Sequence, residues 1–260
     1  MDSIFLDLPA RNAKPRSSGL TMAIDNGIPH GAFADAMASG ADYVDVVKFG
    51  WGTALVTPDV ERKFEVLRQL GIGYYFGGTL FEKFVQQERF ESFLTLCRLC
   101  GCRYVEISNG TIDMSLEDKA YFIKRCAEEF TVLSEVGFKD ADRSSALTAE
   151  ELLDAIHADA EAGASYVITE ARESGRSGIC RPDGTPRDDL VDAILSSDIE
   201  SDHLIFEAPT KDLQTHFIKL LGTNVNLGNI APCEVIGLET LRLGLRADTL
   251  MHFEQARSCA

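Results

Sequence analysis

The sequence predicts a single-domain (β/α)₈ barrel, also called a TIM barrel. Eight short runs of apolar, β-favouring residues recur along the chain, and stretches with helical spacing separate them. This alternation is typical of a parallel sheet, and 260 residues is a common length for one such barrel. Most runs end in a charged or amide residue followed by glycine or a turn. Because the carboxyl ends of barrel strands build the active site, these polar endings are the candidate functional residues.

Residues 1–18 are expected to form an extended lead-in, because Pro9 and Pro15 oppose helix formation. Residues 19–260 are expected to form the barrel, which is the catalytic domain. Strands are predicted near residues 20–25, 43–48, 72–76, 103–107, 131–136, 166–170, 203–207 and 223–227, where β-branched and aromatic residues cluster.

The helices between these strands are predicted from their caps and apolar spacing. Thr57 is the expected N-cap of one helix, with Pro58 in its first turn, and that helix runs to Gly71. Ser115, and Thr148 with Glu151, are expected to cap two later helices. The remaining helices are predicted near residues 30–39, 81–98, 187–196, 210–221 and 232–246.

Charge and composition limit the class of partner. A net charge of −16 argues against binding to nucleic acid, whose phosphates require a basic surface. No apolar run is long enough for a membrane span, and the N-terminus does not resemble a secretory signal. We therefore expect a cytoplasmic protein with reduced cysteines, and a homo-oligomer. Cys97, Cys100 and Cys102 could suggest a metal site, but they lie where a helix ends and a strand begins, without a nearby histidine.

Four carboxylates are predicted at strand ends: Asp25, Glu106, Glu170 and Glu207. Strand-end carboxylates converge on the barrel axis and offer the oxygen ligands that Mg²⁺ prefers. The alternative is that some of them form ion pairs with neighbouring cations or face a helix.

Two lysines also stand near strand ends, Lys48 in VVKFGWG and Lys139 in GFKD. A partly desolvated lysine can donate a proton or act as a Schiff-base nucleophile, and the sequence alone does not choose between these roles. A buried ion pair with a neighbouring carboxylate is the structural alternative.

The segment ESGRSG, residues 173–178, is the best candidate for an anion site. Its glycines can turn backbone N–H groups inward, its serines add hydroxyl donors, and arginine matches phosphate or sulfonate. A second candidate is NLGN, in the loop after the last strand, and Lys14 and Arg16 are candidates to close over the mouth. The predicted anion-binding residues are Arg172, Ser174, Arg176, Ser177, Gly178, Asn226 and Asn229.

Nine segments resemble the phosphosulfolactate synthases of coenzyme M biosynthesis, and they follow one another in the family's order. They are KPR (14–16), DYVDVVKFGWGTALV (42–56), GGTLFE (77–82), VEISNGTIDM (105–114), GFKD (137–140), EARESGRSGI (170–179), IFEAPTK (205–211), NVNLGNI (224–230) and LETLRLGLRADTL (238–250). The resemblance covers nearly the whole chain, and several segments are long and unusual.

The resemblance implies a Mg²⁺-dependent carbon–sulfur lyase of sulfonate metabolism that adds sulfite to phosphoenolpyruvate, giving (R)-2-phospho-3-sulfolactate. It implies that Lys139, in the GFKD segment, protonates carbon 2 and that Lys48 helps to neutralise the substrate. The same family shape includes plant heat-stress-associated proteins. Because both lysines and the ESGRSG loop are present here, we expect the enzyme branch.

Two other readings stay open at this point. One is a different barrel lyase or aldolase that acts on a phosphorylated substrate through a Schiff base at Lys48 or Lys139. The other is a non-enzymatic stress or interaction protein on the same fold.

Overall fold

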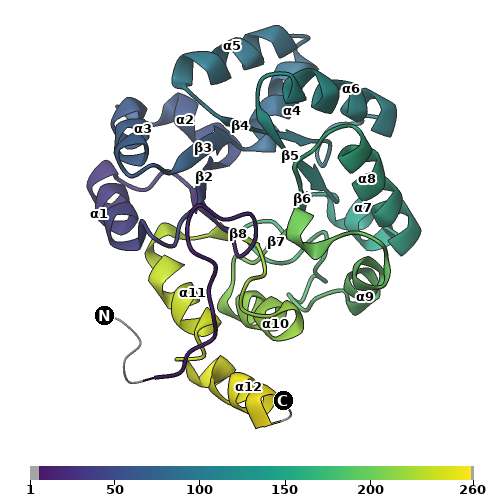
Figure 1. The fold of residues 1–260 in the computed structure, drawn as a ribbon. Helices are drawn as coiled ribbons and strands as arrows, with labels where there is room; N and C mark the ends of the chain where they lie inside the picture. Colours follow the sequence, from purple (N-terminus) through teal and green to yellow (C-terminus); the bar gives the residue numbers. More distant parts are fainter. Residues whose placement is uncertain (1–5, 259–260) are drawn as a thin grey trace.

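A computed structural model describes residues 6–258 of the chain. Eight parallel strands form one sheet in the order β3-β2-β1-β8-β7-β6-β5-β4, and helices form an outer ring around it (Figure 1). The predicted (β/α)₈ barrel is confirmed. The strands are β1 (Thr21–Asp25), β2 (Val46–Phe49), β3 (Gly73–Phe76), β4 (Tyr104–Ser108), β5 (Thr131–Val136), β6 (Tyr166–Thr169), β7 (Leu204–Glu207) and β8 (Leu227–Ile230).

The helices follow the strands, and several connections carry two of them. They are α1 (His30–Gly40), α2 (Thr53–Val56), α3 (Val60–Gln69), α4 (Gly78–Gln86), α5 (Phe90–Cys100), α6 (Leu116–Ala127), α7 (Ala141–Ala146), α8 (Ala149–Glu161), α9 (Asp188–Ser196), α10 (Lys211–Leu221), α11 (Val235–Arg242) and α12 (Ala247–Ser258). Three short 3₁₀ turns are also present, η1 (Gly50–Gly52), η2 (Ser201–His203) and η3 (Pro232–Glu234). None of the helices described is long and apolar enough to cross a membrane.

The barrel is closed by side chains at one seam. Strands β3 and β4 stand at the two ends of the sheet order and lie close together without hydrogen-bonded pairing. At this seam the ring of Tyr104 packs against Gly73, where a Cβ atom would clash with it. Nearer the carboxyl ends, the N–H of Gly78 donates to Glu106 Oε1 at 2.5 Å. Strands β3 and β4 are therefore joined by side-chain packing near their amino ends and by a hydrogen bond near their carboxyl ends.

Alternation along the strands creates two cores, because successive side chains point to opposite faces of a strand. One face packs against the helices, where the ring of Phe49 in β2 meets that of Phe64 in α3. The other face fills the inside of the barrel, and burial of each large side chain there contributes about 1.5–3 kcal/mol. The inner side chains are Met22, Val46, Tyr75, Leu133, Ile168 and Ile205, with Tyr104 and Tyr166 packed against them.

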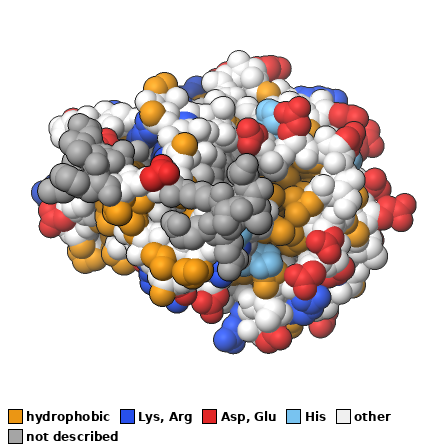
Figure 2. Space-filling model, turned by 60° about the horizontal axis from the view of Figure 1, so that its bottom comes forward, with side chains coloured by type: hydrophobic (Ala, Val, Ile, Leu, Met, Phe, Trp, Pro, Cys, Tyr) orange, Lys and Arg blue, Asp and Glu red, His pale blue; other side chains and the backbone are white. Residues whose placement is uncertain are grey.

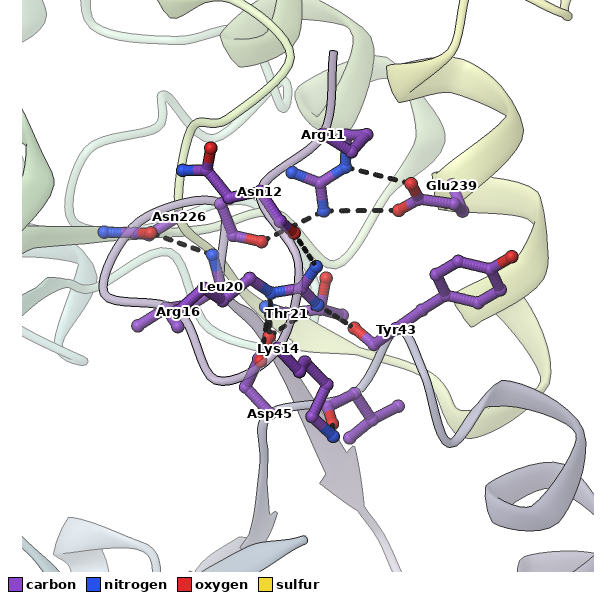
Figure 3. Close-up of polar contacts among 12 residues, drawn as sticks. Arg11, Asn12, Lys14, Arg16, Leu20, Thr21, Tyr43, Asp45, Asn226 and Glu239 are labelled. Carbon is purple, nitrogen blue, oxygen red and sulfur yellow. Dashed lines mark hydrogen bonds and ion pairs between the residues drawn. The ribbon is translucent and has the colours of Figure 1, made fainter. Parts of the chain in front are cut away.

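The N-terminal segment crosses the amino-terminal end of the barrel (Figure 3). Arg16 forms a forked ion pair with Asp45, just before β2, with Nη2 to Oδ2 at 2.9 Å. Lys14 Nζ donates to the carbonyls of Ala41 and Val44, and Arg11 pairs with Glu239 of α11 at 2.9 Å. The expectation that Lys14 and Arg16 close over the mouth is wrong, because both side chains contact residues 41–45, which precede β2 at the opposite end of the barrel.

Several predicted elements differ in detail from the structure. The single helix expected near 81–98 is two helices, α4 and α5, and Glu88 between them has φ 55°. Thr57 is no N-cap, since α3 begins at Val60 after Asp59. The last strand begins later than predicted, at Leu227. The predicted helix near 232–246 is divided into η3 and α11.

Two predicted helix caps are confirmed. The side chain of Ser115 accepts a hydrogen bond from the N–H of Asp118. Thr148 and Glu151 form a complete capping box, in which each side chain accepts from the other's backbone.

Candidate active site

A layer of charged side chains lies above the apolar interior, at the carboxyl ends of the strands. Each member comes two residues after an inner apolar residue of its own strand, so it points to the same side. The five are Lys48, Glu106, Glu135, Glu170 and Glu207, and each is at most 6% exposed. They line a cavity of about 310 Å³ together with Lys139, Arg172 and Asn229.

Lys48 occupies the centre of this layer. Its Nζ lies 3.0 Å from Glu106 Oε2, 3.2 Å from Glu135 Oε2 and 3.3 Å from Glu207 Oε1. Burial alone would lower the pKa of the Lys48 ammonium, but the three carboxylates outweigh it and hold that pKa well above its usual value. Lys48 is therefore a fixed positive charge that joins three strands.

Lys139 follows β5 and reaches back over the cavity. Its ammonium contacts Glu135 Oε1 and lies 2.9 Å from Glu170 Oε2. Burial would lower the pKa of Lys139, but the two carboxylates raise it above the ordinary range. With 19% of its side chain exposed, Lys139 is more accessible than Lys48 at 8%. It is the ammonium group that a bound molecule could most readily meet.

The buried carboxyl groups divide into two kinds. Burial raises the pKa of Glu106 to about 7, against the opposing effect of Lys48. Burial also raises the pKa of Glu170 well above its usual value, and the neighbouring Glu135 and Glu207 add to this effect. Burial would raise the pKa of Glu135 as well, but Lys139 and Lys48 outweigh it and hold that pKa well below its usual value. The site therefore favours the ionised form of Glu135 and disfavours ionisation of Glu106 and Glu170.

Three of these carboxylates could hold a divalent cation. One oxygen each from Glu135, Glu170 and Glu207 lies within 4.8 Å of the other two. Asn229 Oδ1, from a residue that lines the same cavity, is buried without a hydrogen-bond donor among the described residues. Three cationic side chains face five carboxyl groups around the cavity. A divalent cation would balance that excess of carboxyl groups, so the donor set fits Mg²⁺.

Asp25 does not join this cluster. It follows Ile24, which lines the cavity, and so Asp25 points outward from the barrel. There it pairs with Lys63 of α3 at 2.5 Å, and its other oxygen accepts from the N–H groups of Gly27 and Ile28. Both of its oxygens are paired there, so the structure does not bring Asp25 to the carboxylates that could hold a metal ion.

The loop after β6 brings only Arg172 of its predicted anion-binding residues to the cavity. Ser177 donates to the carbonyl of Phe138 at 2.8 Å, and Gly178 donates to Ser144 at 2.6 Å. Ser174 is exposed, and Arg176 lines a different cavity. The loop's glycines serve close packing instead. A side chain on Gly178, at φ 59°, would clash with the backbone of Glu170.

The two predicted asparagines lie at opposite ends of β8. Asn229 lines the cavity, in a left-handed conformation at φ 57°. Asn226 precedes the strand, where it accepts from Leu20 N at 2.9 Å (Figure 3). It also donates to the carbonyls of Asp202 and Leu204. Asn226 therefore ties the amino-terminal ends of strands together, and the structure does not bring it to the mouth.

Glu135 is the site residue that the strand-end pattern does not identify, because Lys139 lies nearer the end of the same run. Strand parity identifies it, since Leu133 faces the barrel interior and Glu135 is two residues further on. Helix α4 is a second addition. It begins at the cavity, where Gly77, Gly78 and Thr79 form part of the wall. The N-terminus of a helix favours negative charge.

A (β/α)₈ barrel with a charged cavity at the carboxyl ends of its strands has the architecture of a barrel enzyme. The family model for (2R)-phospho-3-sulfolactate synthase matches residues 9–248. The chain is 53% identical to the phosphosulfolactate synthase of Bacillus subtilis, over 96% of this chain and 99% of that protein. It is 42% identical to the phosphosulfolactate synthase of Methanothermobacter thermautotrophicus, over 93% and 95% of the two chains. The chain belongs to the phosphosulfolactate synthase family.

Solved structures at low identity share the fold. The 3-hexulose-6-phosphate synthase of Salmonella typhimurium superimposes with a TM-score of 0.55 at 14% identity, over 90% of this chain and 99% of that one. A phosphonopyruvate hydrolase complex with oxalate and Mg²⁺ superimposes with a TM-score of 0.54 at 14% identity, over 84% of this chain and 77% of that one. At these identities the likeness concerns the barrel alone.

Proposed function

We propose that this chain adds sulfite to phosphoenolpyruvate and so forms (R)-2-phospho-3-sulfolactate, with Mg²⁺ as its cofactor. Family membership supports the product, since the related proteins carry its name. The observation that carries the mechanism is the position of Lys139, a charged and partly exposed ammonium above a buried carboxylate cluster. That arrangement offers a proton and positive charge to an anionic substrate.

The proposed reaction forms one C–S bond and one C–H bond. The sulfur lone pair of sulfite attacks carbon 3, and the π electrons of the C2–C3 double bond move toward carbon 2 and the carboxylate. The ammonium of Lys139 then gives its proton to carbon 2. Sulfite is a nucleophile in its own right at neutral pH, so the reaction requires no serine or cysteine paired with a base. Positioning and charge neutralisation are the tasks left to the protein.

Cationic side chains would hold the anionic groups of the substrate. Arg172 lines the cavity with a half-exposed side chain, and its guanidinium suits a phosphate or carboxylate. Thr79, in the first turn of α4, lies on another part of the wall. Lys48 lies deeper and is surrounded by carboxylates, so we assign it to neutralising developing charge and not to transferring a proton.

Glu135, Glu170 and Glu207 would hold the Mg²⁺ ion, replacing the predicted set that included Asp25. When bound, the ion would act as a Lewis acid and stabilise negative charge on the substrate carboxylate. Backbone N–H groups keep two of these carboxylates in place. Those of Ala171 and Arg172 donate to Glu207 Oε2 at 2.9 and 3.0 Å, and that of Arg172 also donates to Glu170 Oε1 at 2.6 Å.

The same electrostatics disfavour Schiff-base chemistry. A nucleophilic lysine must lose its proton, and enzymes achieve this with a lowered pKa. The pKa values of Lys48 and Lys139 are both raised instead, since burial is outweighed by the carboxylates around them. An aldolase that works through either lysine is therefore the weaker proposal.

The decisive measurement is the consumption of phosphoenolpyruvate with sulfite, in the presence and absence of Mg²⁺. Formation of phosphosulfolactate that requires both sulfite and Mg²⁺ would support the proposal, and no consumption under any of these conditions would refute it. Borohydride reduction in the presence of substrate tests the aldolase alternative. A trapped covalent adduct on either lysine would replace sulfite addition with Schiff-base chemistry.

A further inference from the structure

A second cavity of about 280 Å³ lies between α7 and the loop that joins β6 to α9. It shares no lining residue with the catalytic cavity. Its wall includes the polar residues Ser144, Ser145, Arg176, Arg181, Arg187 and Asp189. Nothing in the proposed reaction uses this cavity.

Three guanidinium groups face this cavity with a single carboxylate among them. Arg187 Nη2 pairs with Asp189 Oδ2 at 2.7 Å. Arg181 Nη2 lies 3.6 Å from Asp189 Oδ1, which is too far for a good hydrogen bond. The side chain of Arg176 has no hydrogen-bond or ion-pair partner in the part of the chain that the structure describes. The lining therefore carries a net positive charge.

The positive charge of this cavity is unusual for such an acidic protein. The chain as a whole carries −16, and acidic side chains are spread widely over the face drawn in Figure 2. A concentration of arginine on such a protein focuses a positive potential over one small area. Arginine side chains also repel one another, so a cluster of three guanidinium groups with one carboxylate is stabilised by a bound anion.

Neutral donors complete the wall. Ser144 Oγ accepts from the N–H of Gly178 at 2.6 Å, which leaves its own hydroxyl proton available to donate. The side chain of Arg187 is held in place by Nη1, which donates to the carbonyl of Ser144 at 3.0 Å. Fixed guanidinium forks and hydroxyl groups match the oxygens of a tetrahedral oxyanion.

We propose that this second cavity binds a small molecule through a tetrahedral oxyanion, a phosphate or sulfonate group, independently of the catalytic cavity. Its volume suits a ligand smaller than the drug-sized molecules that fill cavities of about 300–1,000 Å³. Arg176 lines this cavity and not the catalytic one.

The wall of the second cavity is joined to catalytic residues by direct contacts. Gly178, which donates to Ser144, packs against the backbone of Glu170, and Ile179 N donates to the Glu170 carbonyl at 2.8 Å. Ser177 Oγ donates to the carbonyl of Phe138, the residue before Lys139. An anion in the second cavity would therefore stabilise the loop that positions Glu170.

Calorimetric titration with inorganic phosphate, and separately with methanesulfonate, tests the proposal without any turnover. We expect affinity for at least one probe to fall about tenfold in Arg181→Ala and in Arg176→Ala, because each loses a charged hydrogen bond. Both side chains are exposed, so both variants should fold. Arg68→Ala, which removes an exposed arginine of α3, is the matched control and should bind as the wild type does. Binding of only one of the two probes would show whether the cavity prefers a phosphate or a sulfonate group.

Arg172→Ala separates the two cavities, because Arg172 lines only the catalytic one. Binding that persists in Arg172→Ala and weakens in Arg181→Ala would support a separate site. The proposal is overturned if neither probe binds the wild type at millimolar concentration, or if both cavity variants bind as tightly as the wild type. Because binding is measured without substrate, failure of the sulfite reaction would leave this result intact.

Amide hydrogen exchange provides an independent readout of the contact with Glu170. The probe should slow exchange in residues 171–180 of the wild type, where the N–H groups of Gly178 and Ile179 are hydrogen-bonded. The same addition should have little effect in Arg181→Ala. Equal protection in the wild type and the variant would place the anion elsewhere and contradict the proposal.

Discussion

Glu135 Oε2 lies 3.2 Å from Lys48 Nζ, although the two residues stand on β5 and β2, which are not neighbours in the sheet. The other oxygen of Glu135 contacts Lys139, four residues further along the chain. The Glu135 carboxylate thus links the buried ammonium of Lys48 to the more exposed ammonium of Lys139. Because both lysines depend on it, Glu135 sets the charge and the position of the proposed proton donor.

Glu135→Gln should reduce kcat/KM by at least about 100-fold, a loss on the scale of general acid catalysis. Glutamine keeps the shape of the side chain but removes the charge that holds Lys139 and Lys48. Since breaking a buried ion pair costs about 3–5 kcal/mol, the free energy of unfolding should also fall. Steady-state kinetics and urea unfolding measure the two effects. The exposed substitution Glu161→Gln is the control, and wild-type kinetics in Glu135→Gln would contradict this role.

Lys139→Ala should reduce turnover by about 10²–10⁴-fold, because the proton donor is missing. Because the Lys139 side chain is partly exposed, the variant should keep its fold, which circular dichroism can check. The configuration of the product at carbon 2 gives a sharper readout. A residual reaction in the variant should lose stereochemical control at carbon 2, since the proton would come from water. Near-wild-type rates would remove Lys139 from the mechanism.

The sequence predicted the barrel well because each strand is a separate local signal. Strand positions followed from clusters of β-branched and aromatic residues, and helix caps at Ser115 and Thr148 followed from local hydrogen bonding. The break between α4 and α5 was missed because FEKFVQQERFESF contains neither glycine nor proline. A left-handed residue at Glu88 leaves little trace in a sequence.

The candidate site was predicted less completely because a strand end alone does not fix the direction of a side chain. Glu106, Glu170 and Glu207 share the parity of the inner residues and face the cavity, whereas Asp25 has the opposite parity and meets Lys63. The placement of Arg176 depends on how a long loop packs against α7, which no local pattern encodes.

Mg²⁺ should stabilise the wild-type protein and release protons as it binds. The pKa of Glu170 is raised by burial and by Glu135 and Glu207, so a cation on these carboxylates competes with a proton for Glu170. At 100 times its dissociation constant, the ion would add about 2.7 kcal/mol to the free energy of unfolding. Calorimetry in buffers of different ionisation enthalpy measures the released protons, and affinity should rise with pH.

The ligand assignment is tested by two matched variants. Glu170→Gln should lose most of the Mg²⁺ stabilisation, because it removes one of the three clustered carboxylates. Asp25→Asn should keep it, even though the loss of the Lys63 ion pair lowers the starting stability. Stabilisation by Mg²⁺ that is lost in Asp25→Asn and kept in Glu170→Gln would reverse the assignment.

Glu106 should make the metal-free protein less stable as the pH rises from about 4.5 to 7. Burial raises its pKa to about 7 in the folded protein, against an ordinary value of 4.5. Between these values the folded state binds more protons than the unfolded state, so stability falls with rising pH, by about 1 kcal/mol per unit from this group. Urea unfolding at pH 5 and pH 7 in wild type and Glu106→Gln measures the difference. An identical pH dependence in both would show that Glu106 does not titrate in this range.

Arg16→Ala should lower stability while leaving kcat unchanged. The side chain is 3% exposed, and its ion pair with Asp45 fastens the N-terminal segment to the end of the barrel away from the cavity (Figure 3). Removing one partner of a buried pair costs about 3–5 kcal/mol. We expect a loss near the lower value, because Asp45 would still accept the hydrogen bond from the N–H of Thr21 at 2.8 Å. Thermal and urea unfolding measure the loss, and Arg68→Ala, in an exposed pair with Glu65, should lose much less. Because residues at the amino-terminal end of a barrel serve stability and those at the other end serve catalysis, a drop in kcat of the folded Arg16→Ala enzyme would contradict this division.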